Sequence, residues 1–148
     1  MDVYLDKYFW QQNYEPVVSC QFQRRMGYRG DGGKWVCDPH RIQSQECLVY
    51  SIGARLEHSF ESAVAGGLSC EIHTFDPFWN KTSAYPTKNA KYHLIGVAAN
   101  PEYRVIRGKE YRMMTLPSIV KMLGHEGRII DILKIDIEGE GTNLFGDE

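Results

Sequence analysis

The sequence has no marked excess of charge of either sign. Lys and Arg together number 17 and Asp and Glu number 19, so the net charge at pH 7 is −2. Proteins that bind nucleic acid or acidic membranes through their charge usually carry a basic patch, but the basic residues here are scattered apart from Arg24-Arg25. No apolar run approaches the roughly 20 residues of a membrane-spanning helix. The composition therefore favours a globular domain with no nucleic-acid partner and no membrane span.

Cysteines are few, and the paired ligands of a zinc finger are missing. The four cysteines, Cys20, Cys37, Cys47 and Cys70, are irregularly spaced. Cys37 and His40 stand at a metal-like interval, but no second pair follows them. We therefore predict no metal site and keep buried thiols or one disulfide as alternatives. In an oxidising compartment we expect Cys37 to pair with Cys47, because these two residues flank one loop.

Short apolar runs alternate with amphipathic stretches along most of the chain. Strands are predicted at residues 47–52, 70–75, 92–98 and 129–136, and helices at 56–67 and 115–127. This alternation is typical of an α/β protein with a parallel sheet. Residues 2–12 predict a short amphipathic helix, and 27–40 predict a Gly-rich loop. The pattern over 101–114 is ambiguous, and a small hairpin around Gly108 is one interpretation of it.

Two residues at predicted strand ends suggest a nucleoside site. Ligands of open parallel sheets bind beyond the carboxyl ends of the strands, where Gly53 follows the first strand and Asp76 ends the second. A glycine lets backbone approach a ligand, and an exposed carboxylate can accept both hydroxyls of a ribose. The alternative is a tight turn at Gly53 and a structural cap at Asp76. The G-x-G-x-x-G phosphate signature is missing, which favours a nucleoside ligand without phosphates over NAD or FAD.

The stretch "DILKIDIEGEG" ends the last predicted strand in charged residues. Lys134, Asp136 and Glu138 alternate along it and so share one face. Charges in a central strand are costly unless they are paired or used in function. Either Asp136 lies beside a bound ligand at the mouth of the sheet, or Lys134 pairs with one of these acids under a loop.

Several of these motifs together resemble a known family. The stretches "VYSIGA", "IHTFDP" and "MTLPSIVKMLGHEGRIIDILKIDIEG" follow the order found in FkbM-type methyltransferases. The box "RGDGGKWVCDP" resembles the opening element of methyltransferase-like proteins. The resemblance covers roughly residues 20–140 and implies a class I, Rossmann-like fold with strand order 3-2-1-4. It also implies S-adenosylmethionine as the methyl donor.

The resemblance assigns roles to individual residues. Asp76 would hold the ribose, and Asp136 would act as the catalytic-site residue near the sulfonium and the acceptor. Asp31 to Lys34 would cover the cofactor. The remaining cofactor-binding residues would be Ser51, Gly53 and Ala54 on the methionine side and Val97 and Ala98, within the stretch 97–100, beside the adenine.

The function expected from this resemblance is S-adenosylmethionine-dependent methyl transfer to the hydroxyl of a small-molecule or glycan acceptor. One alternative is a non-catalytic cofactor-binding or interaction module, and another is a metal-dependent sugar transferase that uses Asp136 and Glu138 as a D-x-E site. We expect residues 1–148 to form one partial domain, with 1–46 preceding a half-sheet over 47–148. If the domain is truncated after its fourth strand, that strand becomes an exposed edge through which the chain self-associates.

Overall fold

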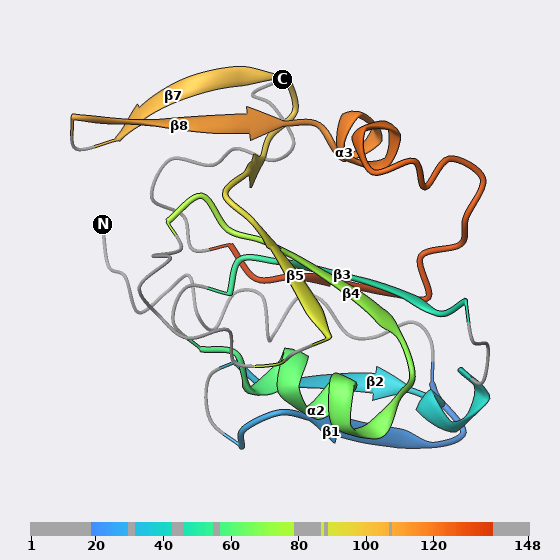
Figure 1. The fold of residues 1–148 in the computed structure, drawn as a ribbon. Coiled ribbons are helices and arrows are strands. Elements are labelled where there is room, and N and C mark those ends of the chain that lie inside the picture. Colours follow the sequence, from blue (N-terminus) through green and yellow to red (C-terminus); the bar gives the residue numbers. More distant parts are fainter. Residues whose placement is uncertain are drawn as a thin grey trace.

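A parallel sheet forms the centre of the protein. The computed structural model describes residues 19–29, 32–42, 46–54, 57–78, 87, 89–106 and 108–137. The strands of the central sheet lie in the order β5-β4-β3-β9, and all three pairings are parallel (Figure 1). Their bounds are β3 (Leu48–Ile52), β4 (Glu71–Phe75), β5 (Ala90–His93) and β9 (Ile132–Ile135). The α/β class with a parallel sheet is therefore confirmed.

The two faces of the sheet are covered by different elements. Every residue of β3 is buried, as expected of a central parallel strand with both faces covered. On one face, Val49 packs with Phe60 and Val64 of α2 (Ser59–Gly67). The antiparallel hairpin of β1 (Gln23–Met26) and β2 (Lys34–Cys37) lies on the same side and is followed by a 3-10 turn, η1 (Pro39–Arg41) (Figure 1).

The opposite face packs against a second small sheet and a helix. Leu48, Tyr50 and Ile52 contact a cluster that includes Ile119 of α3 (Leu116–Met122). The second sheet has the order β6-β8-β7, with β6 (Gly96–Val97), β7 (Glu102–Ile106) and β8 (Lys109–Met114). Within the described part of the chain, no helix is long and apolar enough to cross a membrane.

Local signals account for the second sheet and the helix after it. Gly108 connects β7 to β8 at a φ of 77°, which a residue with a side chain rarely adopts, and the predicted hairpin over 101–114 is confirmed. Thr115 is the N-cap of α3, and its hydroxyl accepts a hydrogen bond from the Ser118 N–H at 3.2 Å. The helix ends before Gly124, which has a φ of 69°.

The predicted third strand, residues 92–98, differs from the structure. It is divided into β5, which continues the central sheet, and β6, which pairs with β8. A Cβ on Gly96 would lie 2.5 Å from the Met113 side chain, so this glycine permits the close approach to β8. The central sheet has the order β5-β4-β3-β9, which corresponds to the expected order 3-2-1-4. Only the first part of the predicted third strand belongs to this sheet, because the rest forms β6 in the second sheet.

The N-terminal region contains a strand where a loop is predicted. The prediction of a loop over 27–40 is wrong for residues 34–37, which pair with β1 as strand β2. Val36 of this strand is buried against the α2 side of the sheet, and this burial supplies the driving force for a strand in a Gly-rich region. The helix predicted at 2–12 and the start of the helix predicted at 56–67 lie outside the described residues, and α2 begins at Ser59.

The predicted Cys37–Cys47 disulfide is wrong. Cys47 is bonded to Cys70 and Cys37 to Cys20. The parallel register pairs the residues that directly follow Cys47 and Cys70, so these cysteines are neighbours at the amino ends of β3 and β4, with a Cα–Cα distance of 4.6 Å. In the hairpin, Cys37 at the end of β2 lies opposite the start of β1, and its Cα is 5.3 Å from that of Cys20.

We predict that removing the Cys47–Cys70 disulfide by Cys47→Ser with Cys70→Ser lowers the free energy of unfolding by about 3 kcal/mol, because the bond closes a long loop in the unfolded chain. Urea denaturation measures this loss. Non-reducing peptide mapping of the unsubstituted protein is the control. It should recover the 47–70 linkage, and recovery of a 37–47 linkage would contradict the structure.

Candidate cofactor site at the carboxyl ends of the strands

A pocket lies where the carboxyl ends of β3, β4 and β9 meet the start of β6. Four residues singled out from the sequence line it, namely Gly53, Asp76, Val97 and Asp136. Phe75, Phe78 and Ile137 are among the apolar residues that complete its walls. The pocket therefore combines carboxylates with an apolar lining at the edge of the sheet where ligands of parallel α/β proteins bind.

Gly53 makes the turn after β3 possible. Its φ is 76°, and a Cβ at this position would lie 2.1 Å from the carbonyl oxygen of Asp136. The Gly53 N–H donates to the Phe75 carbonyl at 2.9 Å, and the Asp136 N–H donates to the Ile52 carbonyl at 2.9 Å. The ends of the three strands thus meet closely only because residue 53 has no side chain.

Asp76 is buried, not exposed as the sequence suggested. Only 2% of its surface is accessible. One carboxylate oxygen, Oδ2, accepts a hydrogen bond from the Ala54 N–H at 3.1 Å, and the other, Oδ1, accepts one from the Phe78 N–H at 2.8 Å. Asp76 therefore fixes the turn after β3 to the end of β4.

Asp136 stands at the rim of the pocket and is ion-paired. Its Oδ2 lies 2.8 Å from Nζ of Lys34 and 3.9 Å from Nζ of Lys134. About a third of the Asp136 side chain is exposed. Lys34 comes from β2, in the box "DGGKW" that resembles the methyltransferase-like proteins. Of the stretch 31–34 predicted to cover the cofactor, Lys34 therefore reaches the site, while Asp31 lies outside the described residues.

A buried ion pair lies behind the turn at Gly53. Lys134 donates to the Gly53 carbonyl at 3.2 Å, and its Nζ lies 3.6 Å from Oε1 of Glu61. The Ser51 hydroxyl donates to the same Glu61 oxygen at 2.5 Å. Both charged side chains are almost completely buried, at 3% accessibility for Lys134 and 0% for Glu61. Lys134 thus pairs mainly with an acid of α2, where the sequence suggested one of its own strand.

Glu61 is the residue of this network that the sequence analysis missed. It stands between Phe60 and Val64, which are buried on the sheet-facing side of α2. A glutamate on the apolar face of a short helix is unusual unless it is paired, and this was the available signal. Glu61 acts together with the charged end of β9, because it neutralises the ammonium group of Lys134, and this group donates to the Gly53 carbonyl.

Three predicted cofactor residues do not line the pocket. Ser51 faces α2 and bonds to Glu61. Ala54 is buried and donates its N–H to Asp76. Ala98 is also buried and donates its N–H to the Met114 carbonyl at 3.0 Å, which extends the pairing of β6 with β8. These residues support the walls of the pocket from behind.

Comparison with known proteins identifies the family. A family model described as "Methyltransferase domain" matches residues 4–145, nearly the whole sequence. The chain therefore belongs to this methyltransferase domain family. It is similar to "Probable methyltransferase-like protein 24" of Rattus norvegicus, with 31% identity over 102 residues. That match covers 67% of the chain but 27% of the relative, so the chain spans about a quarter of the length of this protein. No solved structure matches the chain.

We predict that Lys134→Met lowers the free energy of unfolding by about 3 kcal/mol, because it leaves the Glu61 carboxylate buried without its cation. Chemical denaturation measures the change, and Lys121→Met on the exposed surface of α3 is the matched control. Replacing both partners, Lys134→Met with Glu61→Leu, should recover much of the loss. Equal effects of Lys134→Met and Lys121→Met would show that the buried pair does not stabilise the fold.

Proposed function

We propose that this domain binds S-adenosylmethionine in the pocket at the carboxyl ends of β3, β4 and β9 and transfers its methyl group to an oxygen acceptor. The observation that carries the proposal is the convergence of Gly53, Asp76 and Asp136 at one edge of a parallel sheet in a member of a methyltransferase family. The fit rests on two features. The missing side chain at Gly53 lets the ends of β3 and β9 meet beside the pocket, and the Asp76 carboxylate lies among the apolar residues that line it.

Each residue of the pocket has its own role in binding the cofactor. Asp76 accepts hydrogen bonds from the ribose hydroxyls, while Val97 and Phe78 offer apolar surface to the adenine. Asp136 lies beside the sulfonium, whose positive charge competes with the Lys34 ammonium group for this carboxylate. Ser51, Ala54 and Ala98, which the resemblance placed in contact with the cofactor, act as supports of the turn and of β6. The bound cofactor supplies an electrophilic methyl group, and the protein contributes mainly by holding donor and acceptor in line.

The acceptor is proposed from the resemblance to FkbM-type methyltransferases, which favours a hydroxyl of a small molecule or glycan. Because the chain spans 27% of its relative, we propose comparing its methyl transfer and cofactor binding with those of the full-length relative. Methyl transfer by the relative together with cofactor binding by both would support donor binding within residues 1–148.

A second candidate function is a non-catalytic interaction module, which the exposed edge of the sheet favours. Among the described residues, β9 has a strand partner on one side only, β3. Leu133 and Ile135 are 44% and 46% exposed on this strand. An unpaired edge with exposed apolar side chains favours pairing with another chain.

We predict that Asp76→Asn weakens S-adenosylmethionine binding about a hundredfold, since charge-assisted hydrogen bonds to the ribose are lost. Calorimetry measures the affinity. The same substitution should lower the free energy of unfolding by about 1 to 2 kcal/mol, because an amide nitrogen cannot accept from a backbone N–H.

The control for this loss of stability is Thr115→Ala, which removes the N-cap of α3 and costs about 1 kcal/mol without touching the pocket. Both variants are measured where they are fully folded. If both bind the cofactor as tightly as the unsubstituted protein, Asp76 is a structural cap only.

We also predict self-association through β9. Light scattering across a concentration series should show a dimer or larger species, and Ile135→Lys should shift it to monomer because edge strands that carry charge resist pairing. Lys109→Glu, on the hairpin of the second sheet, is the control. A monomer at every concentration would remove the support for an interaction module.

A further inference from the structure

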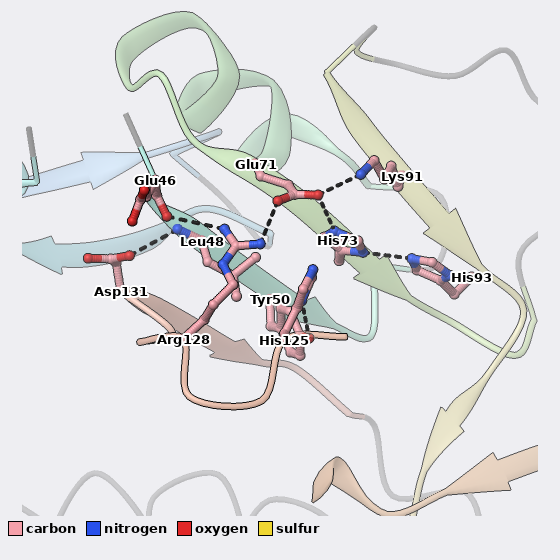
Figure 2. A network of polar contacts seen from close by, with 10 residues as sticks. All are labelled: Glu46, Leu48, Tyr50, Glu71, His73, Lys91, His93, His125, Arg128 and Asp131. Carbon is pink, nitrogen blue, oxygen red and sulfur yellow. Dashed lines mark hydrogen bonds and ion pairs between the residues drawn. The ribbon is translucent and has the colours of Figure 1, made fainter. Parts of the chain in front are cut away.

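A second polar cluster lies on the α3 face of the central sheet, away from the pocket. Glu71 begins β4, and His73 follows two residues later on the same face of that strand. His125 comes from the turn after α3 and reaches the same place (Figure 2). The Nε2 atom of His73 lies 3.0 Å from Oε1 of Glu71, and one ligand atom from each of the three residues lies within 4.8 Å of the others.

Both imidazole rings are held in place from behind. Nδ1 of His73 shares a hydrogen bond of 2.9 Å with Nε2 of His93, and Nδ1 of His125 shares one of 2.8 Å with the Tyr50 hydroxyl. Figure 2 shows the other nitrogen of His125 directed toward the side where Glu71 and His73 meet. The His73 and His125 rings stand edge to face with centroids 4.9 Å apart. The Nδ1 atom of each ring is thus held by a partner, while Nε2 of His73 contacts Glu71 and the other nitrogen of His125 is directed toward the same space.

The histidines of the cluster are buried, and its carboxylate reaches the surface. His73 and His125 are 2% and 6% exposed, and the Glu71 side chain is 30% exposed, which leaves the site open on the Glu71 side.

We propose that Glu71, His73 and His125 form a binding site for a divalent transition metal ion, with zinc as the best-suited ion. The ligand atoms are Oε1 of Glu71 and Nε2 of each histidine. Two imidazoles and one carboxylate are ligands that zinc accepts, with a further position left for water. Hydrogen bonds to the second nitrogen of each histidine are the usual support of such ligands. With a metal on Nε2, His73 carries its proton on Nδ1 and donates it to His93.

Two cationic side chains, Lys91 and Arg128, already contact the Glu71 carboxylate. They differ in whether a bound metal ion would displace them. Lys91 places its Nζ 2.5 Å from Oε1 of Glu71, the oxygen assigned to the metal, but its side chain is 62% exposed. Arg128 contacts the other oxygen, Oε2, at 2.8 Å and also donates to the Glu46 carbonyl at 3.2 Å. A metal ion therefore displaces the Lys91 ammonium group into solvent and leaves Arg128 in place. Metal and Lys91 compete for one oxygen atom.

This competition gives the sharpest test. Zinc is titrated calorimetrically into the oxidised protein, whose described cysteines are all in disulfides and do not compete as thiolates. We expect one zinc ion per chain and a rise in the melting temperature with zinc. His125→Gln and Glu71→Gln should each weaken binding at least about tenfold, whereas Lys91→Met should strengthen it severalfold. The control is His40→Gln, at an exposed histidine of η1, which should leave the affinity unchanged.

Cobalt(II) serves as a second probe, because its visible absorption reports the coordination geometry. An intense tetrahedral spectrum that is lost in His125→Gln supports the site. Absence of saturable zinc binding by the unsubstituted protein overturns the proposal, as does an equal loss in His40→Gln and His125→Gln. If His125→Gln fails to fold, Lys91→Met decides, because substitution of this exposed side chain should spare the core. Unchanged or weaker zinc binding by Lys91→Met then overturns the proposal.

Discussion

The parallel pairing of β3 with β4 on one side and β9 on the other is the constraint on which the rest of the structure depends. At the amino end, the pairing of Leu48 with Glu71 brings the preceding cysteines together as a disulfide. At the carboxyl end, Ile52 lies opposite both Phe75 and Ile135, so the three following residues, Gly53, Asp76 and Asp136, meet at one edge. A slip by one residue would separate the disulfide, the turn and the pocket at once.

The central sheet carries buried polar chemistry on both faces. Toward α2, Lys134 and Glu61 form an ion pair beneath the turn, and this pair orients backbone at the pocket. Toward α3, the histidines of β4 and of the turn after α3 lie beside Tyr50. Burying such groups costs desolvation free energy. A role in positioning or in ligand binding therefore accounts for the presence of each group in the core.

The sequence was informative where a local pattern determines the structure. Apolar runs bounded by turn residues predicted the parallel strands. The rule that ligands bind at the carboxyl ends of such strands then predicted that Gly53, Asp76 and Asp136 lie together, and all three line the pocket. The hairpin around Gly108 followed from the ability of glycine to adopt a positive φ.

The features that sequence did not predict depend on register and on distant contacts. The partners of Cys37 and Cys47 are set by strand pairing, which spacing along the chain does not encode. The burial of Asp76 depends on the turn at Ala54 folding over it. The division of residues 92–98 depends on Met113, far along the chain, packing against Gly96. His73 and His125 are far apart in the sequence, and only the folded structure brings their rings together.

The short strand β2 carries two of the features described above at its opposite ends. Lys34, its first residue, reaches the carboxylate at the rim of the pocket, and Cys37, its last residue, is bonded to Cys20. The Cys20–Cys37 bond therefore crosslinks the same strand that carries a cation to the pocket. Without this bond, the position of Lys34 would rest on noncovalent contacts of β2, namely its pairing with β1 and the burial of Val36.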